Sequence, residues 1–205
     1  MRVALVHDWL TGMRGGEKIL ERLCRMFPDA PIYTLVWKRG SVSAEIESHP
    51  IRTSFLQHLP DAARRYRWYL PLFPRAIESL RLDAAEVVIS TSHAVAKSVL
   101  APPGAFHLSY LCTPMRYIWE LEHEYFPPGR FPWPLSAYVR STCERLRRWD
   151  VATAHRAQAM LAISEHVAER ISRHYGREVG IVYPPVDVAS FAPAASHGDY
   201  YLLAG

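Results

Sequence analysis

The feature that most constrains the fold is the order of patterns in the first 36 residues. Residues 3–6 form a continuous apolar run, Val-Ala-Leu-Val, which is typical of a strand buried on both faces of a sheet. Glycines punctuate residues 8–16, and apolar side chains then recur at helical spacing from Ile19 to Phe27, before Pro28. A second apolar run covers residues 31–36. This order predicts a strand–helix–strand unit with a right-handed crossover.

The same alternation continues along the chain. A helical pattern covers residues 137–155, and Ser164 is a suitable N-cap for another helix. Further apolar runs predict buried strands at residues 86–90, 105–111, 158–163, 179–183 and 200–205. We therefore predict an α/β fold, a Rossmann-like, mostly parallel sheet of about seven strands with helices on both faces.

The length of 205 residues fits one full domain and is short for two. Residues 192–198 are small and polar and include a proline, which is typical of a linker, and an apolar run begins again at Tyr200. We predict one domain over residues 1–191. Residues 192–205 are predicted to be a linker and the first strand of a missing C-terminal domain.

Composition excludes several classes of protein. With 49% hydrophobic and 21% charged residues, the chain is neither disordered, nor a coiled coil, nor collagen-like. Its three cysteines are widely spaced and lack zinc-ligand spacing, which predicts a reducing compartment and no bound metal. A net charge of +4 is too mild to indicate nucleic acid. No signal peptide or membrane-spanning run is visible, so we predict a soluble cytoplasmic protein, with any contact to the inner face of the cytoplasmic membrane peripheral.

Ligands of open parallel sheets bind at the carboxyl ends of the strands, where the strand order reverses. Segments at such positions are residues 7–17, 90–97, 112–119, 164–166 and 183–187. In the first of them, Gly15 and Gly16 precede a helix, so their backbone amides can approach an anion at its N-terminus. The segment matches neither the dinucleotide pattern G-x-G-x-x-G nor the P-loop. A tight turn that needs glycine is the alternative interpretation.

The next two segments bring other chemistry to the same edge. Three hydroxyl residues precede His93, where hydroxyls commonly cap the following helix, and the hydrolase motif G-x-S-x-G is absent. Arg116 stands beside Tyr117 and Trp119, a set that can clamp a phosphate or stack on a sugar. The alternative is a surface arginine over packed aromatic rings. Cys112 has no obvious base nearby in the sequence that would make it a reactive thiol.

Residues 61–81 combine five arginines with two acids, a net charge of +3, and interleave them with aromatic and leucine residues. Such a segment can lie on anionic lipid or contact nucleic acid, and an ordinary helix pair with one apolar face is the alternative. We predict no nucleic-acid partner. The predicted membrane-facing residues are Arg64, Arg65, Arg67, Trp68 and Tyr69. A second group of arginines, within residues 140–156, is interpreted as the solvated face of the predicted long helix.

Four motifs occur in a recognisable order along the chain. They are Arg2-Val-Ala-Leu-Val-His-Asp-Trp-Leu, Gly15-Gly-Glu-Lys, Thr113-Pro-Met-Arg-Tyr-Ile-Trp, and Val182-Tyr-Pro-Pro-Val-Asp followed by Phe191. Together they resemble group 1 (family 4) glycosyltransferases, and most closely the mannosyltransferase-like members that build lipopolysaccharide O-antigen and exopolysaccharide. The resemblance implies the N-terminal half of a GT-B fold, an acceptor-binding domain that faces a donor domain in cis or in trans. It also implies retaining transfer from a nucleotide sugar, with no metal and no cofactor.

The resemblance also implies roles for individual residues. Gly15 and Gly16 form the loop that approaches the donor diphosphate, where their amides suit the charge of a departing nucleoside diphosphate. Cys112 stands where many relatives carry a histidine near the reacting sugar. A cysteine cannot offer an imidazolium, and either His93 or His7 could take that place in space; His93 and Cys112 are the candidate catalytic residues. The residues predicted to bind the acceptor are Asp8, Trp9, Arg116, Tyr117 and Trp119. Asp187 and Phe191 correspond to the family's signature near the hinge.

These observations predict a hexosyltransferase, with mannose as the favoured sugar, acting on a lipid-linked or polysaccharide acceptor in cell-surface glycan biosynthesis. Without its donor domain the chain is predicted to be inactive. The alternative is a non-catalytic module that binds a membrane or a glycan through residues 61–81. A nicotinamide or redox enzyme on the same fold would need a fingerprint that this chain lacks.

Overall fold

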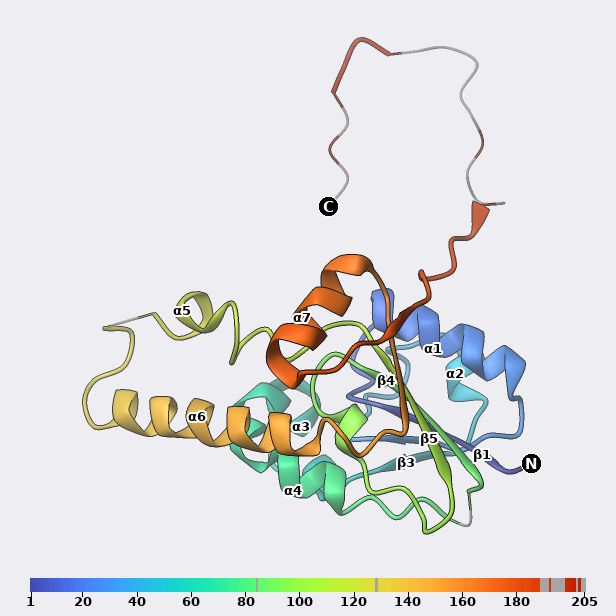
Figure 1. Ribbon diagram of the computed structural model, residues 1–205, viewed down its shortest axis with the longest axis horizontal. Helices are drawn as coiled ribbons and strands as arrows, with labels where there is room; N and C mark the ends of the chain where they lie inside the picture. Colours follow the sequence, from blue (N-terminus) through green and yellow to red (C-terminus); the bar gives the residue numbers. More distant parts are fainter. Residues whose placement is uncertain (84, 128, 189–191, 193–197, 202, 204–205) are drawn as a thin grey trace.

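Seven parallel strands form a single sheet in the order β3-β2-β1-β4-β5-β6-β7 (Figure 1). The computed structural model describes residues 1–83, 85–127, 129–188, 192, 198–201 and 203. The strands are β1 (Val3–His7), β2 (Ile32–Thr34), β3 (Ile51–Thr53), β4 (Val87–Ser92), β5 (Phe106–Leu111), β6 (Ala159–Ala162) and β7 (Gly180–Ile181). Every neighbouring pair is parallel, so the predicted α/β class and Rossmann-like sheet are confirmed.

The strands alternate with helices along the chain. The longer helices are α1 (Gly15–Met26), α6 (Leu135–Thr153) and α7 (Glu165–Tyr175), and the shorter ones are α2 (Ala44–Glu47), α3 (Ala62–Arg65), α4 (Phe73–Glu78) and α5 (Glu122–Tyr125). The 3₁₀ helices named within the described residues are η1 (Phe55–His58), η2 (Tyr66–Leu72) and η3 (Ala96–Ser98). No helix in the described part of the chain combines the length and apolarity needed to cross a bilayer.

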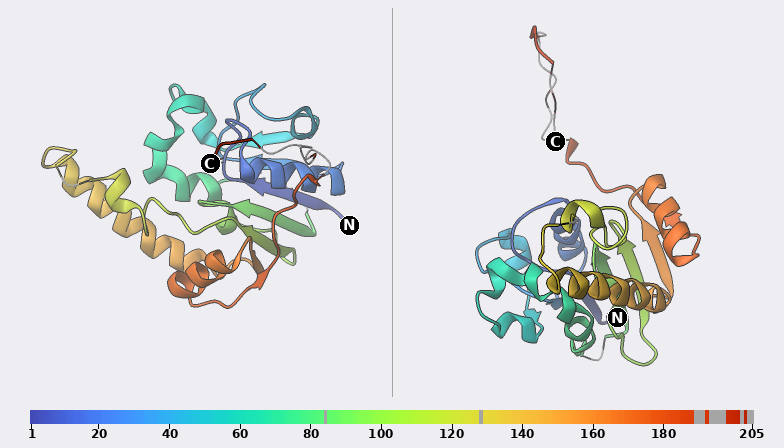
Figure 2. Two further views of the ribbon diagram at one scale, coloured as in Figure 1. Left: turned by 90° about the horizontal axis from the view of Figure 1, so that it is seen from above. Right: turned by 90° about the vertical axis from the view of Figure 1, so that its left-hand side faces the viewer.

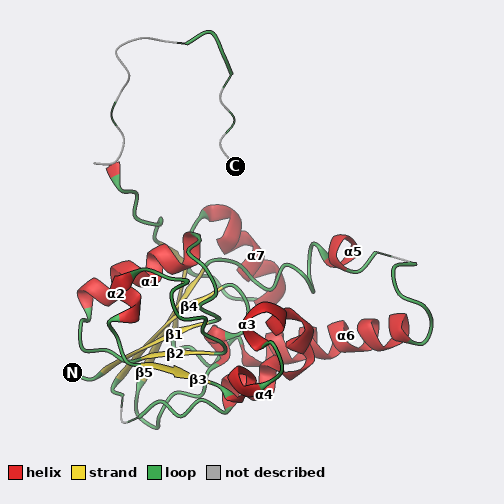
Figure 3. Cartoon of the chain, turned by 180° about the vertical axis from the view of Figure 1, so that it is seen from behind, coloured by secondary structure: helices red, strands yellow, loops and turns green. Residues whose placement is uncertain are grey.

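Both faces of the sheet are covered because successive side chains of a buried strand point to opposite sides. On one face, Leu5 packs in a cluster with Leu20 of α1. The next residue, Val6, packs on the other face in a cluster that contains Leu146 of α6. In Figure 1, α1, α2 and α7 lie above the sheet, α4 lies below it and α6 extends to the left, and Figure 3 shows the same arrangement from behind. Helices on both faces were predicted, and this is confirmed.

The order of the strands reverses at β1. The chain first builds outward from β1 to β2 and β3, and then returns to place β4 on the other side of β1. Val6 therefore pairs with Tyr33 on one side and with Ser90 on the other. Connections that leave β1 and β4 in opposite directions open a crevice at the carboxyl ends of these two strands, where open α/β sheets bind ligands.

Some local predictions differ from the structure. The sequence patterns did not predict β3, a three-residue edge strand whose residues are exposed or only partly buried. Residues 61–81, interpreted as a possible helix pair, form α3, η2 and α4, with Pro71 inside η2. The Ser164 cap is confirmed, since its hydroxyl accepts a hydrogen bond from the Val167 backbone N–H. Of the predicted strand at 200–205, residues 202, 204 and 205 lie outside the described residues, and Tyr200, Tyr201 and Leu203 form no strand; Phe191 also lies outside the described residues.

Two buried polar pairs fix the centre of the fold. Between β4 and β5, the Ser90 hydroxyl lies 2.9 Å from His107 Nε2, and burial lowers the pKa of His107 to about 4. Below the sheet, Lys97 Nζ of η3 lies 2.8 Å from Asp150 Oδ1 of α6, with both side chains fully buried. The second pair anchors α6 to the turn that follows β4. Removing one partner of such a pair leaves an uncompensated buried charge, which costs about 3–5 kcal/mol.

Candidate functional site

A cluster of polar side chains occupies the crevice between β1 and β4. His7 is the last residue of β1, and Asp8 and Trp9 follow it directly. His93 follows β4, and Gly16 belongs to the first turn of α1. These residues are far apart in the sequence and meet because parallel strands end at the same edge of the sheet.

Asp8 holds the turn after β4 through its carboxylate. One oxygen accepts hydrogen bonds from the backbone N–H groups of His93 (2.7 Å) and Ala94 (3.0 Å). The other accepts from Val95 and Ala96, both at 2.7 Å. Four consecutive N–H groups make an anion-binding concavity, and here the chain fills it with its own fully buried carboxylate. An external anion therefore cannot bind to the N–H groups of residues 93–96 and would need other donors at this edge of the sheet.

The same carboxylate orients His93. Nδ1 of His93 lies 3.2 Å from Asp8 Oδ2, and the ring stands edge-on to Trp9 with their centroids 4.5 Å apart. About a quarter of the His93 side chain is exposed (27%). Burial lowers the pKa of His93 despite the nearby Asp8 charge, and the charges of His7 and Arg116 lower it further. The imidazole is thus neutral at neutral pH, and a proton on Nδ1 that faces Asp8 leaves the lone pair on Nε2.

His7 and Glu17 lie beneath the first turn of α1. His7 Nδ1 hydrogen-bonds the Thr91 hydroxyl at 2.7 Å, and its Nε2 lies 3.8 Å from Glu17 Oε1. The other Glu17 oxygen accepts from the Arg14 backbone N–H at 3.0 Å. Burial by itself would raise the pKa of Glu17, but the hydrogen bond and charge of His7 lower it overall. Glu17 is therefore a buried carboxylate at the N-terminal end of α1.

The two glycines of this turn have different surroundings. A Cβ atom on Gly16 would lie 3.3 Å from Cε1 of His7 and 3.8 Å from Nδ1 of His93. No atom lies within 4 Å of the corresponding position on Gly15. Gly16 thus permits the close approach of the α1 backbone to both imidazoles, while Gly15 faces open space. A glycine at position 16 is needed whether this segment is only a tight turn or also a site where backbone amides approach an anion.

The segment after β5 brings a cation to the same edge. Arg116 is exposed, and its charge acts on His93. Trp119, by contrast, donates from Nε1 to Asp150 Oδ2 at 2.9 Å and stacks on His174 with centroids 4.3 Å apart. The ring of Tyr117 packs edge-on against Tyr125. Both aromatic side chains are thus half-buried in packing contacts. Burial, followed by the charge of Asp8, raises the pKa of Tyr117, so Tyr117 as well as Arg116 lies within electrostatic reach of the crevice, whereas Trp119 is held by Asp150 and His174.

Cys112 also lies near the crevice. Burial, followed by the charges of Asp8 and Glu17, raises the pKa of its thiol to about 12. The thiol is therefore protonated at neutral pH, and thiolate is the reactive form of cysteine. This argues against an activated nucleophile at Cys112 and favours His93 of the two predicted catalytic residues; His7 and Glu17 also lie at this edge.

The predicted membrane-facing residues lie on α3 and η2. The second of these elements adjoins the crevice, since the ring of Tyr66 contacts Trp9 and the guanidinium of Arg67 lies 5.3 Å from the Tyr66 ring centroid. Arg64, Arg65, Arg67 and Trp68 are exposed. The guanidinium of Arg65 lies over Trp68, 5.2 Å from the ring centroid. Tyr69 is half-buried and donates to the carbonyl of Pro60.

Three participants were not predicted as site residues. Glu17, the third residue of α1, accepts a hydrogen bond from the backbone N–H of Arg14, but arginine at the N-cap cannot accept one in return, so the Ser/Thr-x-x-Glu signature of a capping box is missing from the sequence. Thr91 was recognised only as one hydroxyl in a row of three. Tyr66 borders the crevice through its ring contact with Trp9, at 4.8 Å between centroids, and no local pattern indicates this.

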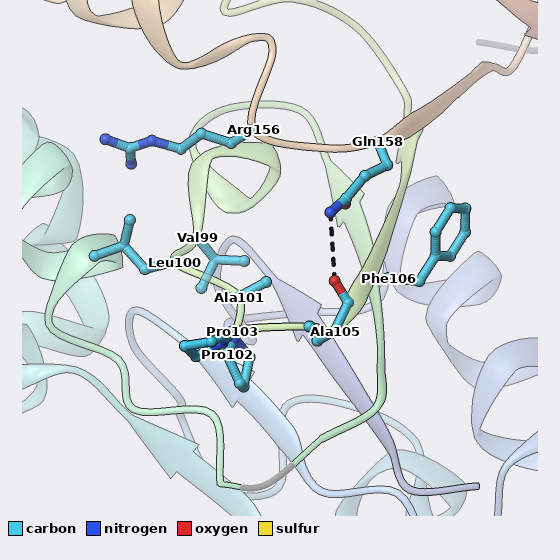
Figure 4. Close-up of a pocket in the computed structure, with 10 residues that line it drawn as sticks. Val99, Leu100, Ala101, Pro102, Pro103, Ala105, Phe106, Arg156 and Gln158 are labelled. Carbon is cyan, nitrogen blue, oxygen red and sulfur yellow. Dashed lines mark hydrogen bonds between the residues drawn. The ribbon is translucent and has the colours of Figure 1, made fainter.

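The opposite end of the sheet contains a cavity of about 510 Å³. Figure 4 shows its lining, which runs from Val99 to Phe106 and includes Arg156 and Gln158. Gln158 donates to the carbonyl of Ala105, and Arg156 pairs with Glu78 at 2.8 Å. These polar groups are engaged by the protein itself. The cavity therefore offers little for specific recognition, and the crevice at the carboxyl ends is the stronger candidate site.

Among the described residues, no three side chains of histidine, cysteine, aspartate or glutamate lie close enough together to hold a metal ion. Asp187 lies exposed in the extended segment after β7, outside the crevice cluster.

The fold and the cluster together define a Rossmann-like α/β protein with a polar site at the point where its strand order reverses. No protein-family model matches the chain. No curated protein matches it either.

Proposed function

We propose that the chain is the N-terminal, acceptor-side domain of a retaining glycosyltransferase that uses a nucleotide sugar. The observation that carries this proposal is the meeting of three groups at one crevice: the N-terminus of α1, the Asp8–His93 pair and Arg116. The motif order described above supplies the family, and the geometry is compatible with it. Because fold alone does not fix function, the proposal depends on these side chains.

The proposed donor diphosphate lies at the first turn of α1. The first four N–H groups of a helix have no partner within it, and the helix dipole favours an anion at this end. Gly15 and Gly16 supply two of these groups; Gly15 borders open space, and Gly16 packs against the imidazoles of His7 and His93. Arg116, exposed at the same edge, adds the positive charge that a departing nucleoside diphosphate needs.

His93 faces the sugar in this proposal. Its neutral imidazole, fixed by Asp8, can accept a hydrogen bond from a sugar hydroxyl through Nε2. Asp8 itself is fully buried and saturated by four backbone N–H groups, so its part is to position His93. The remaining donor contacts belong to a second domain, in cis or in trans. Mannose is the favoured sugar, and a lipid-linked or polysaccharide glycan is the favoured acceptor.

The test is a titration of the 205-residue chain with GDP-mannose, followed by amide and imidazole NMR. Shifts should concentrate at Gly15, Gly16 and the His93 ring. R116Q should weaken binding about tenfold, since a charge-assisted contact contributes about 1.5 kcal/mol. The matched control is R140Q, which removes an equally exposed arginine from α6 and should bind as the unmodified chain does. Shifts that are absent, or equally strong with free mannose, contradict the diphosphate site.

The second candidate function is a non-catalytic module that binds lipid or glycan through Arg64, Arg67 and Trp68. The favouring observation is that these three side chains are exposed together on α3 and η2. This function predicts that W68S abolishes binding to lipid or glycan, and that GDP-mannose leaves the crevice signals unchanged.

A further inference from the structure

Residues 113–121, which we call the arginine segment, follow β5 and bring Arg116 to the crevice. In Figure 1 and in both views of Figure 2 the chain runs here from the sheet towards α5, close to α6 and α7. Met115 and Ile118 are fully buried, whereas Arg116 is exposed. An exposed arginine side chain is flexible, so the place that it reaches depends on how its backbone is held.

Glu120 joins the arginine segment to α7 through one carboxylate oxygen. Oε1 accepts a hydrogen bond from Nε of Arg170 at 2.8 Å and lies 2.8 Å from Nε2 of His174. Arg170 also donates to the Thr113 hydroxyl at 3.1 Å. Oε2 is buried and has no hydrogen-bond partner within the part of the chain that the structure describes. Burial by itself would raise the pKa of Glu120, but the hydrogen bonds with His174 and Arg170 lower it overall, so this group is a carboxylate at neutral pH.

The neighbours of Glu120 connect this contact to Arg116. Leu121 donates from its backbone N–H to the carbonyl of Arg116 at 2.8 Å. Trp119 stacks on the ring of His174, with their centroids 4.3 Å apart. One neighbour of Glu120 is thus bonded to Arg116 itself, and the other packs on the same helix as the carboxylate. A shift of Glu120 away from α7 would therefore move the backbone of Arg116.

We propose that Glu120 is a positioning residue, which sets Arg116 at the crevice by fixing the arginine segment to α7. The inference rests on the proposed function, because Arg116 there supplies the charge that meets the donor diphosphate. The place of Arg116 can nevertheless be measured without a ligand, since its charge acts on the imidazole of His93. Burial is the main cause that lowers the pKa of His93, and the charges of His7 and Arg116 lower it further. Displacement of Arg116 from the crevice must therefore raise the pKa of His93.

The experiment is an NMR titration of the His93 imidazole in the 205-residue chain. R116Q should raise the titration midpoint. E120A should raise it as well, because the arginine segment is released; the loss of a negative charge would by itself lower the midpoint, so the sign separates the two effects. The double variant R116Q/E120A should titrate as R116Q does, since both changes act through the charge of Arg116.

Two conservative variants separate the reach of the side chain from its charge. E120Q is uncharged but can keep an oxygen at the position of Oε1, with its N–H₂ group at the position of the unpartnered Oε2, so it should titrate close to the unmodified chain. E120D keeps the charge but is one methylene shorter, so it should lose contact with α7 and raise the midpoint. The comparison of E120D with E120Q decides the matter even if E120A fails to fold.

The matched control is E78A. Glu78 is about as exposed as Glu120 (31% against 22%) and also pairs with an arginine, Arg156, at 2.8 Å. It lies on α4, beside the cavity at the opposite end of the sheet, so E78A should leave the His93 midpoint unchanged. Circular dichroism should report that the control and the Glu120 variants are folded.

The proposal is overturned if E120D leaves the midpoint unchanged or lowers it, if E120A does so, or if E120Q shifts it as far as E120A does. A larger shift in R116Q/E120A than in R116Q also overturns it, as does an unchanged midpoint in R116Q, because Arg116 would then not stand beside His93. GDP-mannose tests the proposed function separately. If the midpoints move as expected but GDP-mannose does not bind, the diphosphate site is wrong and the positioning of Arg116 by Glu120 stands.

Discussion

The buried pair of Ser90 and His107 makes the stability of the fold depend on pH. His107 is fully buried in β5, where Nε2 meets the Ser90 hydroxyl and Nδ1 has no hydrogen-bond partner. A charged imidazole would need acceptors at both nitrogens and would lose its hydration. Burial accordingly lowers the pKa of His107 from 6.5 to about 4. In the unfolded chain the imidazole returns to its ordinary value of about 6.5.

The sign and size of the effect follow from this difference. Above pH 6.5 both states carry a neutral imidazole, and His107 adds no pH dependence. Between pH 6.5 and 4 the unfolded chain binds a proton that the folded chain does not, so the free energy of unfolding falls as the pH falls. Each pH unit corresponds to about 1.36 kcal/mol, so the loss by pH 5 is about 2 kcal/mol. Below pH 4 the contribution of His107 levels off.

Urea denaturation at pH 7.5 and pH 5, followed by circular dichroism, measures this loss. His107→Gln keeps a polar atom near the Ser90 hydroxyl and cannot be charged, so its loss of stability between the two pH values should be about 2 kcal/mol smaller. His155→Gln, which replaces an exposed imidazole on the turn after α6, is the control and should behave like the unmodified chain. An equal loss in His107→Gln refutes the reasoning. So does an NMR titration that places the midpoint of the His107 imidazole near pH 6.5.

Further expectations follow from the crevice. Asp8→Asn turns an amide N–H₂ toward two backbone donors, and urea denaturation should show a loss of about 2–4 kcal/mol; a smaller loss would mean that water replaces the carboxylate. Gly16→Ala pushes a methyl group against His7 and should cost about 1 kcal/mol with a shifted His7 NMR signal, whereas Gly15→Ala should do neither. Cys112, with its pKa raised by burial to about 12, should resist iodoacetamide at pH 8 until urea unfolds the chain, as mass spectrometry would report; rapid labelling of the folded chain would contradict this.

The sequence predicted those parts of the fold that local patterns encode. The apolar run before Gly15 and Gly16 and the helical spacing after them specify β1, α1 and β2, because each signal lies within a few residues. The edge strand β3 escaped prediction because three residues of mixed exposure, with Arg52 in the middle, carry no periodic signal. Pro71 lies within residues 61–81 and lacks a backbone N–H, which explains why this segment forms short helices instead of a regular helix pair.

The sequence predicted where the candidate site lies, but not which hydrogen bonds connect its side chains. Parallel strands bring His93 and Arg116 to the edge that Gly16 shares, and the topology alone implies this. Asp8 accepts hydrogen bonds from residues that follow it by 85 to 88 positions in the sequence, so no local pattern predicts these bonds. The same holds for Trp119, which the sequence suggested as a binding residue and which Asp150 holds from α6.

The hydrogen bonds to the Asp8 carboxylate restrict the motion of the turn after β4. A turn after a strand usually opens easily, and its amide hydrogens exchange with solvent within a short time. Here the amides of residues 93–96 are bound to a side chain of the neighbouring strand end, so the turn cannot open unless β1 and β4 separate. In hydrogen exchange this turn should rank with the centre of the sheet. The imidazole of His93 is therefore expected to be held in a fixed position, and a ligand that binds there meets a preformed surface.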